Sequence, residues 1–205
     1  MSQRFLPMLA VPSAPFDSPE HLFEVKWNGV RALADSADGA WRLWGRDRAD
    51  YRARYSELAM LSRLPTGTVV DGELVLCSHG VPDLHALLAR HQLTNLASIQ
   101  RQSRSQPVSY VLFDVLTYRG RSLLGQPLHE RRAVLAELLA ALQEPRLVLS
   151  EGVIGPGRAF FEKVVAQGQE GMMAKHLASR YLPGRRSAAW RKIKPSRTAR
   201  AGRGA

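Results

Sequence analysis

The most informative stretch of the chain spans residues 23–31 and reads FEVKWNGVR. A short apolar run, Leu22 to Lys26, stops where Gly29 predicts a turn, so the sequence indicates a strand with Lys26 at its end. A lysine amine is a poor nucleophile while it is protonated, because its ordinary pKa lies near ~10.4. Nearby cations or partial desolvation lower that pKa, and such a lysine can act as a covalent catalyst. Lys26 is therefore a candidate nucleophile, and an ordinary surface lysine is the alternative.

Four further blocks follow this lysine in order. They read DGEL (71–74), YVLFD (110–114), EGMMAK (170–175), and YLPGRRS with WRKIKP (181–187 and 190–195). Together with KWNGVR at 26–31 they resemble the ordered motifs of bacterial-type ATP-dependent DNA ligases, whose lysine motif is K-x-D-G-x-R. Five ordered matches are hard to reach by chance. The resemblance implies that residues 1–195 form the adenylation domain of a covalent nucleotidyltransferase. Residues 196–205 are basic and of low complexity, which predicts a disordered tail.

The periodicity of apolar residues favours an α+β fold. Alternating or β-branched runs predict strands at Leu22–Lys26, Ala40–Trp44, Thr68–Leu76, Val108–Leu116, Leu147–Ser150 and Gly171–Leu177. Helical periods predict helices at Val81–His91, Pro127–Leu142 and Gly157–Gln167, the last ended by Gly168. Because the helices come singly among more numerous strands, mainly antiparallel sheets flanked by helices are expected, rather than a parallel doubly wound sheet. The resemblance implies the same ATP-grasp-like architecture, with the nucleotide in a cleft between two sheets.

The polar segment Leu93–Gln106 carries Arg101 and Arg104 among Ser, Gln and Asn residues. It is interpreted as an exposed connection without regular structure. A loop that faces DNA is the alternative.

Composition and charge indicate a soluble protein with a polyanionic partner. The 205 residues suit one large domain or two small lobes and carry a net charge of +11. No Asp or Glu follows Glu170, whereas ten Lys or Arg residues do, and one-sided charge of this kind favours nucleic acid over a merely solvated basic tail. One cysteine, Cys77, cannot form an internal disulfide, and the proline-broken N-terminus fits neither a signal peptide nor a membrane span. A cytoplasmic protein is expected, associated with the nucleoid when it is bound to DNA.

The resemblance implies a reaction that uses ATP and Mg²⁺. Lys26 would attack the α-phosphorus of ATP, release pyrophosphate and hold AMP as a phosphoramidate. The AMP would then pass to the 5′-phosphate at a nick in double-stranded DNA, and a 3′-hydroxyl would displace it during repair or recombination. Each step is a substitution at phosphorus, so cations are needed where charge develops on the phosphate oxygens.

The lysines of the later motifs are expected to stabilise the negative charge that develops on the phosphate oxygens. The resemblance places Lys175, Lys192 and Lys194 around the α-phosphate, with contact to the DNA backbone or solvent exposure as the alternative. Lys192 and Lys194, two residues apart on an extended segment, are expected on one face. Lys175 lies five residues after Glu170, and ideal pleating would place these two on opposite faces, so Gly171 must bend the strand.

Carboxylates and an aromatic ring complete the expected site. Through the resemblance, Glu73 and Glu170 would contact the ribose or bind Mg²⁺, which takes oxygen ligands. Phe113 would stack on adenine, with Glu24 and Val25 at the adenine edge, and Arg31 and Arg46 would approach the ribose or phosphates. Two further acids, Asp71 and Asp114, could have either structural or functional roles, and both roles stay equally open. Asp71 is nevertheless expected to fix a turn at Gly72.

Two departures from the ligase pattern leave alternatives open. Asn28 stands where the family has aspartate. If that carboxylate tunes the lysine or orients Arg31, its loss should slow adenylation. If it only holds a turn by hydrogen bonding, asparagine should serve equally well. The chain also stops just past Lys194, where ligases continue into an OB-fold domain, so a separate OB-fold or repair protein is a possible partner. A non-catalytic nucleic-acid-binding remnant is one alternative function. An RNA ligase or guanylyl-type transferase is another, and the bacterial character of residues 181–195 disfavours it.

Overall fold

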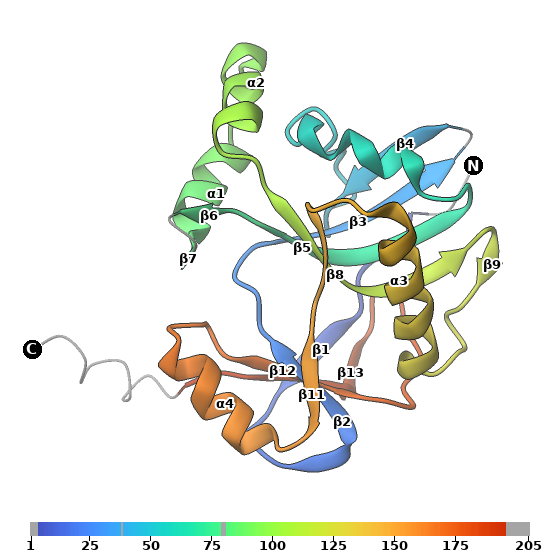
Figure 1. Cartoon of the computed structure of the whole chain (residues 1–205), viewed down its shortest axis with the longest axis vertical. Coiled ribbons are helices and arrows are strands. Elements are labelled where there is room, and N and C mark those ends of the chain that lie inside the picture. The colour runs from blue at the N-terminus through green and yellow to red at the C-terminus, as the bar shows by residue number, and fades with distance from the viewer. Residues whose placement is uncertain (1–3, 38, 79–80, 196–205) are drawn as a thin grey trace, which may run out of the picture.

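Two sheets stacked face to face organise the molecule. The computed structural model describes residues 4–37, 39–78 and 81–195, so the predicted tail at 196–205 lies outside the described residues. Within them, the lower sheet in Figure 1 has the strand order β1-β13-β12-β2-β11, and the upper sheet has the order β10-β8-β5-β3-β4, with β9 paired to β8. The pairings of β1 with β13 and of β10 with β8 are parallel, whereas the others within these two sheets are antiparallel. The predicted α+β fold with mainly antiparallel sheets is confirmed.

The lower sheet is built from segments far apart in the sequence. Its strands are β1 (Leu9–Pro12), β2 (Ser18–Val25), β11 (Gly152–Gly155), β12 (Met172–His176) and β13 (Arg186–Ile193). The upper sheet consists of β3 (Val30–Ala37), β4 (Ala40–Trp44), β5 (Thr68–Val75), β8 (Ser109–Tyr118), β9 (Arg121–Ser122) and β10 (Leu147–Leu149). The short strands β6 (Cys77–Ser78) and β7 (Val81–Pro82) form a separate hairpin.

Helices pack on the outer faces of both sheets, and two of the helices, α1 and α2, project away from the upper sheet (Figure 1). The helical segments are the 3₁₀ segment η1 (Ser56–Arg63) and the α-helices α1 (Leu84–His91), α2 (Leu96–Ser105), α3 (Leu128–Leu142) and α4 (Gly157–Ala166). Helix α3 packs on β8 and β10, and α4 packs on β2, β11 and β12. None of the helices in the described residues is both long and apolar enough to span a membrane.

Three apolar clusters follow from the alternation of side chains along the strands. The first lies between the outer face of the upper sheet and the helices and includes Leu74, Leu112 and Leu135. The second lies between the two sheets and includes Leu33, Phe113 and Trp190. The third lies under α4 and consists of Phe23, Val164, Met172, Ala174 and Ile193, with partly buried neighbours. The middle cluster fills only part of the space between the sheets, and polar side chains and a cavity occupy the remainder.

Most of the predicted elements are confirmed, with shifted ends. The predicted helix at Val81–His91 begins only at Leu84, because Val81 and Pro82 pair with β6 and the Asp83 carboxylate caps the helix by accepting from the amide of Ala86 at 2.9 Å. Gly168 ends α4 with a φ of +76°, as expected of a residue that follows a helix.

A strand that the sequence did not indicate lies in the upper sheet. Strand β3 reads VRALADSA, and alanine and aspartate are poor strand formers. It forms nevertheless because β4 and β5 pair with both of its edges, and the side chains of Ala32, Leu33 and Ala34 are fully buried. Tertiary pairing decides this element rather than local propensity.

The interpretation of Leu93–Gln106 as an irregular connection is wrong. Residues 96–105 form α2, and the side chain of Asn95 caps it by accepting from the amide of Ser98 at 3.0 Å. Only Ile99 and Ser103 of this helix are buried. A single apolar residue on the buried face gives no hydrophobic period, which is why the pattern did not indicate a helix.

The two undecided aspartates are both fully buried. Asp71 lies inside β5, so the expected turn at Gly72 does not exist; a Cβ at Gly72 would lie 2.5 Å from the carbonyl oxygen of Val111, and glycine is required by packing. Asp114 accepts two bonds from the guanidinium of Arg131, at 2.7 and 2.8 Å. Asp114 is therefore a structural residue, whereas Asp71 orients a side chain of the site.

Candidate active site

A cavity of about 180 Å³ opens between the two sheets. The lower sheet contributes Glu24, Met173 and Lys192, which the strand register places in one row across β2, β12 and β13, and Lys175 and Trp190 form the neighbouring row. The upper sheet contributes one residue from each of three adjacent strands: Arg31, Glu73 and Phe113. Nine of the eleven residues predicted for the site line this cavity, and the other two, Glu170 and Lys194, lie at its Lys26 side.

Lys26 directly follows β2, at the point where the chain crosses from the lower to the upper sheet. Its amide donates to the carbonyl oxygen of Gly171 at 2.9 Å, which fixes the backbone beside β12. A Cβ at Gly29 would lie only 2.2 Å from the carbonyl oxygen of Leu74, so glycine alone fits where this connection passes β5. The Lys26 side chain is 21% exposed and lines the cavity. The backbone thus presents a reachable amine at the cavity wall.

Glu170 binds two of the predicted lysines. Its Oε2 contacts Nζ of Lys26 and its Oε1 contacts Nζ of Lys194. Burial opposes ionisation of Glu170, but the bonds from Lys194 and Lys26 outweigh burial and lower its pKa. The bend required at Gly171 is present, because this residue has a φ of +144° and a Cβ there would lie 2.1 Å from the carbonyl oxygen of Ile193.

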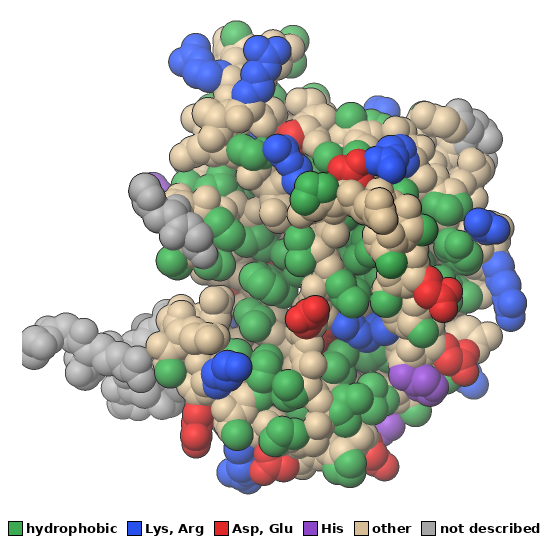
Figure 2. Space-filling model, in the orientation of Figure 1, with side chains coloured by type: hydrophobic (Ala, Val, Ile, Leu, Met, Phe, Trp, Pro, Cys, Tyr) green, Lys and Arg blue, Asp and Glu red, His purple; other side chains and the backbone are tan. Residues whose placement is uncertain are grey.

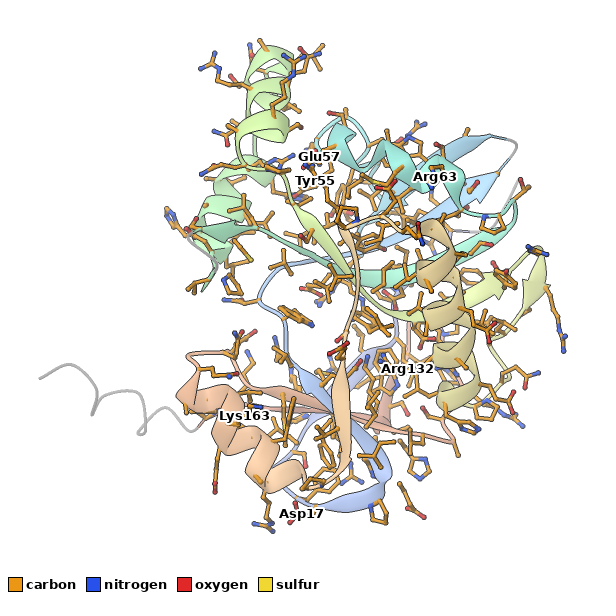
Figure 3. The ribbon with its side chains drawn as sticks, in the orientation of Figure 1. Asp17, Tyr55, Glu57, Arg63, Arg132 and Lys163 are labelled. Atoms are coloured by element: carbon orange, nitrogen blue, oxygen red, sulfur yellow. The ribbon has the colours of Figure 1, made fainter. Side chains whose placement is uncertain are left out.

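Lys175 belongs to a different charge cluster. It is buried and pairs with Oε2 of Glu24 at 2.5 Å, while Nη1 of Arg132 donates to Oε1 of Glu24 at 2.6 Å. Arg132 also donates to the carbonyl oxygens of Ser150 at 2.6 Å and Phe113 at 3.3 Å. Burial lowers the pKa of Lys175, and Glu24 opposes that shift. Arg132 thereby links helix α3 to both sheets (Figure 3).

Arg31 is held in place by Asp71 rather than by residue 28. Its Nε and Nη2 donate to the two carboxylate oxygens of Asp71, each at 2.6 Å, and the Tyr181 hydroxyl donates to Oδ2 of Asp71 at 2.6 Å. Within the described part of the chain, the side chain of Asn28 makes no hydrogen bond or ion pair. The orientation of Arg31 therefore does not require a carboxylate at position 28.

The Phe113 ring lies at the floor of the cavity beside cationic groups. Nζ of Lys175 lies 4.0 Å from the ring centroid and Cζ of Arg31 lies 4.4 Å from it. Trp190 meets Phe113 edge to face, with centroids 6.1 Å apart. The two rings stabilise cations that would otherwise lie unsolvated in this interface. The adenine-stacking role of Phe113 stays a prediction.

Glu73 is a half-buried carboxylate that lines the cavity. Among the described residues it has no ion pair or side-chain hydrogen bond. Burial raises its pKa to about 7, although Arg31, Lys26 and Arg46 act in the opposite direction. A carboxylate without a bonded partner, surrounded by three cations, is suited to bind a ligand group.

The raised pKa of Glu73 predicts a pH-dependent stability. Between about pH 4.5 and about pH 7 the folded state holds a proton that the unfolded chain has lost, so the free energy of unfolding falls as the pH rises through that window. Glu73→Gln cannot ionise, and we expect it to become more stable relative to the wild type as the pH rises from about 5 to about 8. Chemical denaturation at both pH values measures this, and a pH-independent difference would contradict the assignment.

The described residues contain no group of three or more His, Cys, Asp or Glu side chains able to hold a metal ion. Mg²⁺ commonly binds through one or two carboxylates together with waters and substrate phosphates. Glu73 fits that requirement. Glu170 fits it less well, because both of its carboxylate oxygens bind lysines.

Several residues of the site could not be found from the sequence. Arg132 lies in a predicted helix beside Arg131, and no periodicity indicates that both arginines point inward. Trp27, whose Nε1 donates to Oγ of Ser150 at 3.1 Å, also lines the cavity. The polar partners of these side chains come from distant strands, so only the folded chain brings them together.

A lysine at the wall of a cavity between two mainly antiparallel sheets, with cations, carboxylates and an aromatic ring around it, defines the class of covalent nucleotidyltransferase adenylation domains. The sequence model of the family described as "ATP dependent DNA ligase domain" matches residues 7–194. The chain belongs to this family.

Curated relatives agree with that assignment. The DNA ligase-like protein LigB, derived from the SPbeta prophage of Bacillus subtilis, is 31% identical over 180 residues, which cover 87% of this chain and 63% of LigB. The multifunctional non-homologous end joining protein LigD of Mycobacterium bovis is 36% identical over 193 residues, which cover 92% of this chain and 24% of LigD. The chain thus spans less than two thirds of the length of either relative.

Solved structures show the same domain. A mycobacterial DNA ligase D complexed with ATP and MES has a TM-score of 0.76 and 34% identity, covering 93% of this chain and 60% of that one. The ATP-dependent DNA ligase of bacteriophage T7, in complex with ATP, has a TM-score of 0.64 and 20% identity, covering 93% of this chain and 68% of that one. The second similarity concerns the fold alone.

Proposed function

We propose that this domain transfers AMP from ATP to the 5′-phosphate of a DNA nick through a covalent adduct on Lys26, as part of DNA repair or recombination. The observation that carries the proposal is the contact of Lys26 with Glu170 at the wall of the cavity between the two sheets. Nζ of Lys26 would form a bond to the α-phosphorus while the bond from that phosphorus to pyrophosphate breaks. The amine must give up a proton in this step, and Glu170 is the carboxylate in contact with it.

The cations of the cavity suit the charge that develops on the phosphate oxygens. Lys192 and Arg46 line the cavity without an ion pair among the described residues, so their charges are available to a phosphate. Lys194 can exchange Glu170 for phosphate because its side chain is 48% exposed. Lys175 is buried against Glu24 and the aromatic rings, and in our proposal it stabilises the inner end of the site. Glu73 would hold Mg²⁺ together with phosphate oxygens of the substrate.

The nucleoside is assigned to the deeper part of the cavity. Phe113 and Trp190 provide apolar surface there, and Glu24 and Val25 provide backbone and side-chain groups at the C-terminal end of β2. Arg31, fixed by Asp71, would bind the ribose or a phosphate. ATP is the proposed nucleotide, in line with the ATP bound to the similar mycobacterial DNA ligase D.

A nicked duplex with a labelled 5′-phosphate tests the proposed function. With ATP and Mg²⁺ we expect a labelled DNA-adenylate, a sealed strand, or both, and no such product at a nick that carries a 5′-hydroxyl. Accumulation of DNA-adenylate without sealing would indicate that a partner such as a separate OB-fold or repair protein completes the reaction. Preference for GTP and an RNA nick would support the RNA ligase or guanylyl-type alternative. Salt-sensitive DNA binding with no adenylate on protein or DNA would support the non-catalytic alternative.

The proposed place of action is the cytoplasm, at the nucleoid.

Asn28→Asp is expected to change the rate of adduct formation by less than about tenfold. Among the described residues the side chain of Asn28 has no polar partner, and an added half-exposed charge is worth about 1 kcal/mol or less. Asp71→Asn, which weakens the bidentate bond to Arg31, should slow the reaction more. Rates of AMP incorporation compare the two variants, and a large gain from Asn28→Asp would show instead that the charge at this position tunes Lys26.

A further inference from the structure

We infer that the outward face of α2 is a contact surface for the phosphate backbone of duplex DNA beside the nick. This inference rests on the proposed function for the identity of the DNA, and on α2 itself for the contact. The face is the stripe formed by Ala97, Gln100, Arg101 and Arg104, four residues at helical spacing that together with Ser105 line a shallow hollow.

The charge of this face has one sign. Between Asp83 and Asp114 the sequence contains no Asp or Glu. Arg101 and Arg104 are exposed, and neither has an ion pair or a side-chain hydrogen bond among the described residues. Figure 2 shows basic side chains standing out at the top of the molecule, over α2. Two unpaired guanidinium groups one helical turn apart, next to the polar side chain of Gln100, suit phosphate oxygens rather than an apolar protein surface.

The helix is held rigidly although it buries little apolar surface. The guanidinium of the buried Arg90 donates to the carbonyl oxygen of Gln106 at 2.7 Å and to Oγ of Ser103 at 3.1 Å, and it pairs with Glu57 at 2.5 Å. Glu57 also accepts from the amide of Val108 at 3.1 Å. Glu57 and Tyr55 lie at the base of the helix in Figure 3. These bonds fix both the end of α2 and the following chain, so the two arginines project from a defined position.

The topology places this surface near the proposed site of chemistry. The chain leaves the upper sheet at Val75, two residues after Glu73, and returns at Ser109, four residues before Phe113. The exit point is therefore about 7 Å from Glu73 along the strand, and α2 is about 15 Å long. Arg104 lies five residues before Ser109, which pairs with Val75, so the connecting chain spans at most about 18 Å. The summed distance from Glu73 to Arg104 is therefore shorter than one turn of B-DNA, about 34 Å. In Figure 1, α1 and α2 extend on the same side as the connection from β2 to β3 that carries Lys26. A duplex centred on Lys26 can therefore reach α2 with one of its flanks.

Binding of a fluorescent nicked duplex, followed by anisotropy at several salt concentrations, tests this surface. The test variant is Arg101→Gln/Arg104→Gln. The matched control is Arg119→Gln/Arg121→Gln, which removes the same charge from the exposed β8–β9 hairpin at the opposite edge of Figure 1. We expect the α2 variant to lose at least about tenfold in affinity at ~0.1 M salt and about two units of the slope of log K against log salt concentration. The hairpin variant should lose less than half of either quantity.

Flank length and adduct formation separate this inference from the proposed function. On duplexes with one flank cut from ~20 to ~5 base pairs, less than one helical turn, the defect of the α2 variant should disappear for one of the two flanks. A loss equal to that of the hairpin variant, or one that does not depend on either flank, would overturn the inference. Incorporation of AMP into the protein without DNA should be the same in both variants and the wild type. Adduct formation with no α2 effect would leave the proposed function standing and this surface refuted. An α2 effect without any adduct would support the DNA-contact surface and refute the proposed function.

Discussion

Lys26→Ala is expected to lower covalent incorporation of AMP by at least about 10³-fold, because removal of a nucleophile removes the reaction that depends on it. Lys26→Arg should be equally inactive, since a guanidinium stays protonated and cannot attack phosphorus. Both variants should fold, because Lys26 lies at the cavity wall with a partly exposed side chain. Intact-mass measurement after incubation with ATP and Mg²⁺ gives the result directly.

The matched control for this experiment is Lys163→Ala. Lys163 is an exposed lysine of α4 with no ion pair among the described residues, and Figure 3 places it on the outer side of the lower sheet. Its replacement should leave incorporation unchanged. Persistent labelling of Lys26→Ala at the wild-type rate would show that another amine reacts, with Lys192 and Lys194 as the nearest candidates on the same side of the cavity.

Arg131→Met is expected to lower the free energy of unfolding by about 3–5 kcal/mol, because it leaves a buried carboxylate without its counter-charge. Both Arg131 and Asp114 are fully buried, and Arg131 also donates to the carbonyl oxygens of Gln126 at 2.6 Å and Ser179 at 2.8 Å. Denaturant titration measures the loss. Since small domains have only about 5–15 kcal/mol of stability, folding of this variant should be checked first.

Two further variants keep this stability prediction falsifiable. The double variant Arg131→Met/Asp114→Leu should recover part of the loss, because it leaves no uncompensated charge. Arg158→Met breaks an ion pair whose side chains are 67% and 53% exposed, and it should cost about 1 kcal/mol or less. Similar costs for Arg131→Met and Arg158→Met would mean that the buried pair contributes no more than a surface contact.

The fold class was predicted correctly from the sequence, and so was the grouping of most motif residues around one cavity. Each motif is a contiguous run of residues, so its members can be recognised from the sequence. Lys26, Glu73, Phe113 and Lys175 could therefore be assigned before the structure showed that they meet in one cavity. The predicted ends of β5 and β8 lie within two residues of the observed ends. Local patterns failed for β3, which depends on pairing at both edges, and for α2, which buries a single apolar residue.

The partners of the site residues were beyond reach from the sequence. That Arg31 is oriented by Asp71, 40 residues away, follows only from the register of β3 with β5. That Glu170 contacts Lys26 rather than Lys175 follows from the bend at Gly171. The part played by Arg132 depends on how α3 is rotated against β8. These contacts connect residues far apart in the chain, and no local pattern encodes them.

Peptide mass spectrometry of the wild-type protein after incubation with ATP and Mg²⁺ shows whether Lys26 is the nucleophile. We expect one adenylyl group on the peptide that contains Lys26, lost on mild acid treatment as expected of a bond between phosphorus and nitrogen. An unmodified peptide, both in the wild type and in Asn28→Asp, or an adenylyl group on a different lysine, would contradict this assignment.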